Sequence, residues 1–171
     1  LNIDTPIFTS NSCEGTTTLF ETNYFDKKAY LTQSGQLYNE ANMMAFNKVY
    51  SFGPTFRAEK SKTRRHLTEF WMVEPEIAFC SLNENMDWAE KLIKYVLNNI
   101  ILECSNEFKL LNKDVNKLKA FTNQIFPRIT YSEAVEIINK NNGNMKWGDD
   151  FGASHETILS NNFNSPVFVH S

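Results

Sequence analysis

The sequence predicts an α+β fold, in which an antiparallel β-sheet carries helices on one side. Two β-rich runs, 48–59 and 67–79, are separated by a short polar stretch, which is typical of a long hairpin. Apolar residues at helical spacing cover 83–104. The 171 residues are 42% hydrophobic and 22% charged, the composition of an ordinary globular protein of one domain or a large piece of one.

The first 45 residues predict two short strands and a helix. Residues 3–9 alternate like a strand, and Thr5-Pro6 within them favours extended backbone. A second short strand is expected at 29–32. After Gly35 the apolar residues recur at i, i+3 and i+4, which predicts a helix with one buried face over 37–45.

The two β-rich runs form the longest predicted element. Each arm has about eleven residues, and at roughly 3.3 Å per residue the ribbon is about 35 Å long. Because that exceeds the usual strand length, the ribbon is expected to lie inside a larger antiparallel sheet. Residues 60–66 form a basic tip between the arms.

The second half is predicted to be mainly helical. A long helix is expected over 83–104, with shorter helical segments at 107–121 and 131–141. His155 is expected in the first turn of a further helix. Residues 166–169 look like the start of a strand, and both ends of the chain are interpreted as cut points.

Composition excludes several classes of function. Seventeen basic and twenty acidic side chains give a net charge of −3, so bulk charge does not predict nucleic-acid binding, and any RNA contact must be local. Three widely spaced cysteines show no CxxC pattern, which supports neither a disulfide framework nor a zinc site. No stretch approaches the ~20 apolar residues needed to cross a bilayer, so no membrane association is expected.

The densest polar cluster lies on the hairpin. Arg57 and Glu59 alternate on one arm and are expected to share a face, and Phe70 lies on the other arm. A guanidinium beside a carboxylate and an aromatic ring is suited to a nucleotide, with the cation on the phosphates and the ring on the base. The alternative is a solvated hairpin tip with surface ion pairs.

Three other groups have two interpretations each. Glu14-Gly15 follows the first strand as either a binding loop or an ordinary turn. The segment 33–36 (QSGQ) could hold a zwitterion through uncharged groups, or Ser34 could simply cap a helix. Glu74 and Glu76 share a strand face, where a structural network with arginines is as plausible as a ligand contact.

The hairpin carries a specific resemblance. FRAE at 56–59 and RHLTEF at 65–70 resemble motif 2 of class II aminoacyl-tRNA synthetases of the aspartyl/asparaginyl subgroup. The continuation at 71–79 and YLTQSGQL at 30–37 resemble the asparaginyl enzymes. The resemblance implies an incomplete class II catalytic fold: residues 1–171 would run from the end of motif 1, marked by Pro6, through motif 2. The anticodon-binding barrel and motif 3 would lie outside.

The resemblance implies roles for five residues at an ATP site. Arg57 matches the arginine that holds the ATP α-phosphate and the amino-acid carboxylate, and Glu59 matches a carboxylate at the ATP site. His66 matches a histidine near the γ-phosphate. Leu67 matches the residue whose backbone meets the adenine edge, and Phe70 matches the aromatic that stacks on adenine.

Further matches concern the amino acid and the tRNA. Glu14 and Gln36 match residues that hold the substrate ammonium group. Where the aspartyl enzymes typically carry a lysine, this chain has Asn39. The next residue is Glu40, whose carboxylate could accept a hydrogen bond from the amide of asparagine and would repel aspartate. The loop matched to the tRNA acceptor end consists of Ser61, Lys62, Thr63, Arg64 and Arg65.

The implied function is ATP-dependent activation of asparagine and its transfer to tRNA(Asn), by a homodimer in the cytoplasm or, alternatively, in an organelle. The Mg²⁺ ligands are expected beyond residue 171, so no metal site is predicted in this chain and the piece alone is predicted to be inactive. Three alternatives stay open: an aspartyl-tRNA synthetase, a tRNA-independent paralogue that amidates aspartate, and a non-catalytic interaction module.

Overall fold

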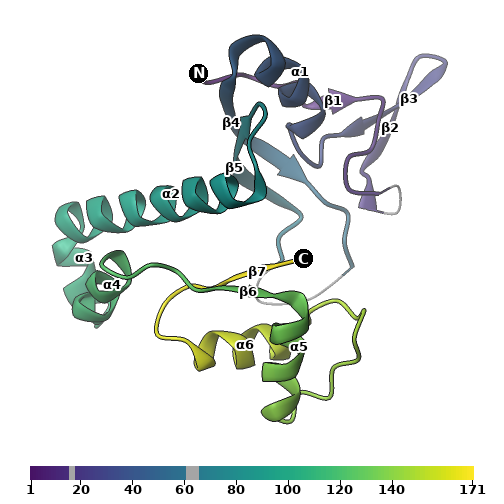
Figure 1. Ribbon diagram of the computed structural model, residues 1–171. Helices are drawn as coiled ribbons and strands as arrows, with labels where there is room; N and C mark the ends of the chain where they lie inside the picture. Colours follow the sequence, from purple (N-terminus) through teal and green to yellow (C-terminus); the bar gives the residue numbers. More distant parts are fainter. Residues whose placement is uncertain (16–17, 61–65) are drawn as a thin grey trace. The chain divides into compact units, whose positions relative to one another are not determined.

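The structure is a computed structural model that describes residues 1–15, 18–60 and 66–171. It divides into two compact units, Leu1–Cys80 (unit 1) and Ser81–Ser171 (unit 2), whose elements are labelled in Figure 1. The chain combines helices with antiparallel strands, so the predicted α+β class is confirmed.

The described part of unit 1 contains strands and one helix. They are β1 (Phe8–Thr9), β2 (Glu21–Tyr24), β3 (Lys27–Leu31), α1 (Gln36–Phe46), β4 (Lys48–Phe56) and β5 (Glu69–Ile77).

The predicted hairpin arms are β4 and β5, which pair antiparallel from Lys48 opposite Ile77 to Phe56 opposite Glu69. Each strand has nine residues instead of the eleven expected. Within the described residues, β4 and β5 form a two-stranded sheet, and β1, β3 and β2 form a separate three-stranded one. The larger antiparallel sheet inferred from the arm length is therefore divided in this structure.

The expected strand over 3–9 is wrong for most of its length. Asn2 bridges to Tyr50 of β4, and only Phe8 and Thr9 are a strand, paired with β3. The break falls at Thr5-Pro6, where proline has no N–H to donate. The apolar alternation is real, but its two ends pair with different strands.

The helix predicted after Gly35 is confirmed as α1. Gly35 is its N-cap, and Asn47 ends it in a left-handed conformation with φ 67° while donating to the Met43 carbonyl at 2.7 Å. Gly35 is also a close-approach position, because an added Cβ would lie 2.8 Å from both Ser51 Oγ and Thr5 Oγ1. The start of the helix therefore sits directly against β4.

Unit 2 is mainly helical in its described residues, which here are all of 81–171. Its elements are α2 (Leu82–Glu103), α3 (Ser105–Leu110), α4 (Val115–Thr122), β6 (Arg128–Thr130), α5 (Tyr131–Lys140), α6 (Ala153–Asn162) and β7 (Phe168–His170).

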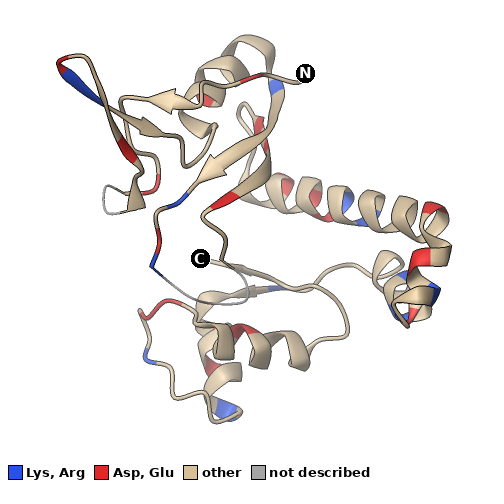
Figure 2. Cartoon of the chain, turned by 180° about the vertical axis from the view of Figure 1, so that it is seen from behind, with Lys and Arg blue, Asp and Glu red and all other residues tan. Residues whose placement is uncertain are grey.

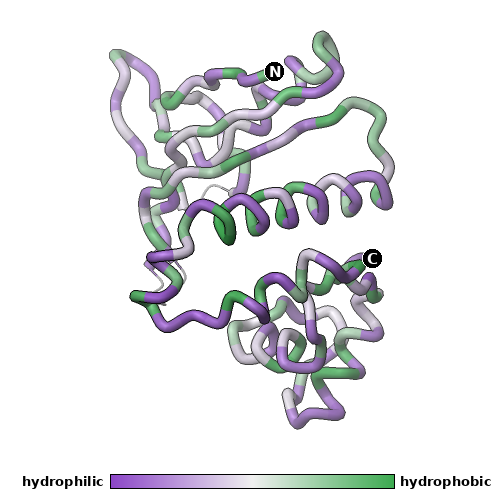
Figure 3. Tube along the Cα trace, turned by 90° about the vertical axis from the view of Figure 1, so that its left-hand side faces the viewer, coloured by the Kyte–Doolittle hydropathy of each residue, from purple (hydrophilic) through white to green (hydrophobic). Residues whose placement is uncertain are grey.

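The long helix α2 starts at a capping box. Ser81 Oγ accepts from the Glu84 N–H, and the Glu84 carboxylate accepts from the Ser81 N–H. Hydrophobic and hydrophilic residues alternate along α2 in Figure 3, and acidic and basic residues are interspersed on it in Figure 2. The helix predicted over 83–104 is thus confirmed within one or two residues.

The helical segment predicted over 107–121 is two helices, α3 and α4. Asn112 between them has φ 50°, a left-handed conformation that interrupts a helix. Asp114 then caps α4 by accepting from the N–H groups of Asn116 and Lys117. The turn chemistry of Asn and Asp therefore outweighs the continuous apolar spacing.

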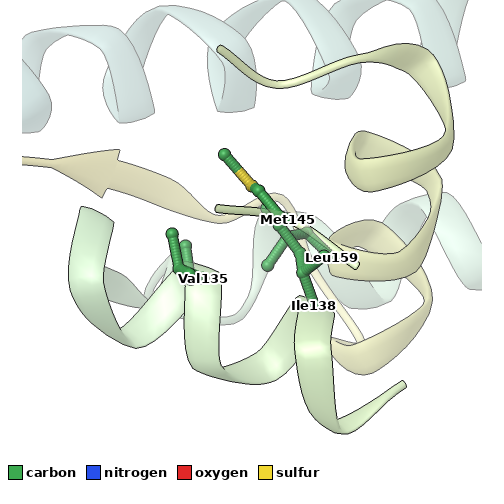
Figure 4. Close-up of a cluster of buried hydrophobic side chains, with 5 residues drawn as sticks. Val135, Ile138, Met145 and Leu159 are labelled. Carbon is green, nitrogen blue, oxygen red and sulfur yellow. The ribbon is translucent and has the colours of Figure 1, made fainter. Parts of the chain in front are cut away.

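A small hydrophobic core holds the last helices of unit 2 together. Val135 and Ile138 of α5 pack with Met145 of the following loop and with Leu159 of α6, as Figure 4 shows. The strand start expected at 166–169 is β7, which pairs with β6 in parallel. That pairing needs the intervening helices as a crossover, which a local sequence pattern does not reveal.

His155 lies in the first turn of α6, as predicted. Its ring Nδ1 accepts from the Gly152 N–H at 3.2 Å, and its Nε2 lies 3.2 Å from the Gly143 carbonyl oxygen. Because Nδ1 is an acceptor here, Nε2 carries the proton and donates to Gly143. The ring therefore ties α6 to the loop after α5.

Among the described residues, no helix combines the length and the apolar character that a bilayer crossing requires.

Candidate active site at the end of the β4–β5 pair

The loop between β3 and α1 is anchored on β5 by one carboxylate. Glu74 accepts a hydrogen bond from the Ser34 hydroxyl through one oxygen, and from the Gly35 N–H at 2.9 Å through the other. Ser34 Oγ also accepts from the Gln36 N–H at 3.0 Å. Glu74 thus has the structural role of the two considered from sequence. It accepts from a hydroxyl and a backbone N–H of this loop, whereas the sequence had suggested arginines as its partners. Ser34 both supports the helix start and links it to Glu74.

Arg57, Glu14 and Phe70 come together next to the end of β4. One guanidinium nitrogen of Arg57 lies 3.3 Å from Glu14 Oε1, and its central carbon lies 5.6 Å from the centre of the Phe70 ring. The Arg57 Nε–H is buried and has no hydrogen-bond partner among the described residues. The guanidinium is therefore held on two sides and keeps one inward-facing donor.

The five residues expected at an ATP site line a single pocket of about 300 Å³. These are Arg57, Glu59, His66, Leu67 and Phe70. Arg57 and Glu59 follow the last strand residue, Phe56, so strand alternation is not what brings them together. The Arg57 N–H still donates to the Thr68 carbonyl at 3.0 Å, which keeps the two arms together one step beyond the strands.

A second group, next to Glu14, combines side chains of the 10–15 loop and α1. Gln36 Nε2 donates to Glu40 Oε1 at 2.9 Å, one turn along the helix, and Cys13 Sγ donates to Gln36 Oε1 at 3.7 Å. Burial raises the pKa of the Cys13 thiol, as do Glu14, Glu74 and Glu40 nearby, although a hydrogen bond with Ser34 lowers it. The thiol is therefore a protonated donor, and it fixes the Gln36 amide with its nitrogen toward Glu40.

The surroundings of Glu40 are negatively charged. Burial, followed by the charges of Glu40 and Glu74, raises the pKa of the Glu76 carboxyl. The carboxylates of Glu40 and Glu74 thus both act on Glu76. An uncharged side chain would be accommodated there more easily than an anion.

Residues 1–171 match the family model described as tRNA synthetases class II (D, K and N). The chain belongs to this family. It is 53% identical to an asparagine–tRNA ligase of Desulforamulus reducens over 168 residues, which are 98% of this chain and 39% of that protein. It thus spans about two fifths of the length of the curated relatives it matches.

Solved structures in this family agree with the fold. An asparaginyl-tRNA synthetase of Pyrococcus horikoshii, complexed with asparaginyl-adenylate, superposes with a TM-score of 0.94 at 44% identity, over 98% of this chain and 38% of that one. An aspartyl-tRNA synthetase of Entamoeba histolytica gives a TM-score of 0.63 at 37% identity, over 77% of this chain and 27% of that one. The described unit architecture is therefore that of a class II synthetase.

Asn39, where aspartyl members of this family typically carry a lysine, is fully buried in α1. Neither atom of its side-chain amide has a hydrogen-bond partner among the described residues. Sequence reasoning used this position for its lack of a lysine and gave Asn39 no contact with the substrate. The structure places it in the packing of α1, and the neighbouring Glu40 is the exposed member of the pair.

The loop expected at the tRNA acceptor end, Ser61 to Arg65, lies outside the described residues. Elsewhere in the chain that the structure describes, no three His, Cys, Asp or Glu side chains gather in a way that could hold a metal ion.

Sequence reasoning missed the supporting residues of this site. Gln33 is 1% exposed and Cys13 is half-buried, and both bond to site residues or to their loop. Neither carries a charge, and their partners are 15 to 23 residues away in the chain. The QSGQ segment was the available signal, but it does not distinguish the buried glutamine from the exposed one.

Proposed function

We propose that this chain is part of an asparaginyl-tRNA synthetase and contributes the motif 2 half of its catalytic site. The observation that carries the proposal is the convergence of the Arg57 guanidinium, the Glu14 carboxylate and the Phe70 ring at one pocket. Both the adenylate-bound relative and the 53%-identical ligase support asparagine as the substrate.

The Arg57–Glu14 ion pair is complementary to a zwitterion. A free amino acid presents a carboxylate and an ammonium a few ångströms apart, and the pair at 3.3 Å presents the opposite charges at close range. Binding exchanges one ion pair for two, with Arg57 on the substrate carboxylate and Glu14 on its ammonium. Gln36, which accepts from Cys13 next to Glu14, adds an amide oxygen as a second acceptor for the ammonium group.

The proposed reaction proceeds in two steps. An oxygen of the asparagine carboxylate attacks the α-phosphorus of ATP, the bond to the bridging oxygen breaks, and pyrophosphate leaves with the electron pair. A terminal ribose hydroxyl of tRNA(Asn) then attacks the carbonyl carbon of the adenylate, releasing AMP and a proton. Neither step needs a nucleophile from the protein, so catalysis consists of positioning and charge stabilisation.

The pocket residues divide these tasks between them. The exposed part of the Arg57 guanidinium is proposed to strengthen its hydrogen bonds as negative charge builds on the α-phosphate. Phe70 presents a half-buried ring on which the adenine can stack. Glu59, His66 and Leu67 complete the wall around the nucleotide.

Glu40 is proposed to distinguish asparagine from aspartate. It accepts one hydrogen bond from Gln36, and a carboxylate has further lone pairs for the substrate amide N–H. An aspartate side chain would instead bring an anion close to Glu40, Glu74 and Glu76. This carboxylate cluster is the observation that favours asparagine over the aspartyl alternative.

The test is pyrophosphate exchange in the complete enzyme with asparagine or aspartate. We expect a clear preference for asparagine, which Glu40→Gln reduces by about tenfold or more because the repulsion of aspartate is lost. Glu136→Gln is the matched control, an exposed helical glutamate with its own i, i+4 partner in unit 2. A wild-type preference for aspartate would overturn the assignment.

Charging of tRNA(Asn) distinguishes the tRNA-independent alternative, in which exchange occurs without charging. We assign the enzyme to the cytoplasm, with an organelle as the alternative, and infer that it acts as a homodimer. We also propose that motif 3, the Mg²⁺ ligands and the anticodon-binding barrel lie outside these 171 residues. The chain by itself is then expected to catalyse no exchange.

A further inference from the structure

Gln33 is a buried and fully bonded side chain of unit 1 that the proposed mechanism does not use. It is 1% exposed. Its Oε1 accepts from two successive backbone N–H groups, those of Cys13 at 3.2 Å and Glu14 at 3.1 Å. Its Nε2 donates to the Gly15 carbonyl at 3.1 Å and to Thr18 Oγ1 at 2.7 Å. All four bonds reach the loop that carries Glu14.

The same loop is tied to the segment that carries Arg57. The Ala58 N–H donates to the Thr18 carbonyl at 2.8 Å. Thr18 therefore receives a bond from Gln33 through its hydroxyl and a bond from the neighbour of Arg57 through its backbone. At the other end of the Gln33 amide, the N–H of Glu14 is held directly.

Gln33 itself is fixed by its neighbours in the chain. The Thr32 carbonyl accepts from the Phe56 N–H at 2.8 Å, which joins the end of β3 to the end of β4. Glu74 holds the two residues that follow Gln33. The amide thus projects from a well-anchored point of the chain into the loop that carries Glu14.

We infer that Gln33 is a positioning residue that sets the distance between Glu14 and Arg57, and thereby the affinity for the α-amino and α-carboxylate groups of the amino-acid substrate. This inference rests on the proposed function, since it concerns the same site. Gln33 does not touch the substrate. It acts through the backbone of Glu14 and through Thr18.

The chemistry of the four bonds requires an amide. One end accepts two N–H groups, and the other end donates twice, which neither a carboxylate nor an apolar side chain of equal size can do. In Gln33→Glu, the oxygen that replaces Nε2 faces the Gly15 carbonyl oxygen with no proton between them. The variant keeps the size of the side chain, removes both donors and places a carboxylate there.

The experiment measures pyrophosphate exchange in the complete enzyme, with separate KM values for asparagine and ATP. We expect Gln33→Glu to raise the KM for asparagine by about 10- to 100-fold, the range for losing a buried hydrogen bond, and to change the KM for ATP less than about twofold. Gln124→Glu is the matched control, because it makes the same change at an exposed position of unit 2. It should leave both constants unchanged.

A merely structural role predicts a different result. If Gln33 only supports folding, Gln33→Glu lowers the active fraction and hence kcat, without a selective rise in the KM for asparagine, and the inference is wrong. If Gln33→Glu does not fold, Thr18→Val is the deciding variant, because it removes the hydroxyl that accepts from Gln33 Nε2. We expect it to raise the KM for asparagine about 3- to 10-fold, and an unchanged KM would overturn the inference.

A double-mutant cycle with Glu14→Gln tests the route of the effect. If Gln33 acts through Glu14, Gln33→Glu changes the KM for asparagine by less than about threefold once Glu14 is already replaced. Fully additive effects would contradict the inference. A wild-type enzyme that activates no asparagine ends the proposed function and this inference together, whereas normal wild-type activity with an unaffected Gln33→Glu variant ends the inference alone.

Discussion

Replacing Arg57 by lysine is the sharpest test of the site, because it keeps the charge and removes the geometry. The guanidinium has two contacts to lose or weaken, the Glu14 carboxylate at 3.3 Å and the Phe70 ring at 5.6 Å, and it also has a buried Nε–H donor. A lysine ammonium reaches only one of these positions at a time and has no planar fork.

The magnitude follows from the donor that is lost. Removing one preorganised donor aimed at developing charge costs about 2.7–4 kcal/mol, or roughly 10²- to 10³-fold in rate. The ion pair with Glu14 adds little, since its partner is nearly half exposed, at 46% of the side chain. We therefore expect Arg57→Lys to lower kcat for asparagine-dependent pyrophosphate exchange by about 10²- to 10³-fold.

Unit 2 offers a closely matched control in Arg128. Its side chain is 27% exposed against 26% for Arg57, it pairs with Asp87, and its central carbon lies 6.0 Å from the Phe168 ring. Arg128→Lys should lower local stability to a similar degree and change kcat less than about twofold. If both variants lose activity equally, the effect is one of stability, and the role of Arg57 in the chemistry is refuted.

Three further outcomes are expected. Asn39→Leu should slow amide hydrogen exchange in α1 of the complete enzyme, because it removes a buried amide that has no partner among the described residues. The expected slowing corresponds to about 1–3 kcal/mol, and faster exchange would show that the amide is satisfied. Glu76→Gln should raise the thermal midpoint of unfolding at pH 8 and leave it unchanged below about pH 4. The reason is that a carboxyl whose pKa is raised in the folded state opposes folding only where it is ionised. An equal rise in the midpoint at both pH values would contradict this reasoning. His155→Ala should destabilise α6 by about 1–2 kcal/mol, measured by hydrogen exchange, because the Gly152 N–H and the Gly143 carbonyl both lose their partner. The control Ser160→Ala loses only one exposed hydroxyl hydrogen bond and should destabilise α6 less.

Local patterns in the sequence determined the helices and the hairpin. The spacing of apolar residues located α1, α2 and α5, because a helix repeats its buried face every three to four residues whatever surrounds it. The two β-rich runs likewise located β4 and β5. The motif residues Arg57, His66, Leu67 and Phe70 were identified by a resemblance that fixes both residue type and loop length.

Tertiary structure alone decided which distant strands pair and which residues support the site. The run over 3–9 divides between two strands, and β6 pairs with β7 in parallel, because pairing depends on partners far away in the chain. The packing of α1 on β4 and β5 decides that Asn39 is buried and Glu40 is exposed, since the rotation of the helix sets which side chain faces outward. Gln33 has no charge and no motif role of its own, and only the fold brings its amide to the loop that carries Glu14.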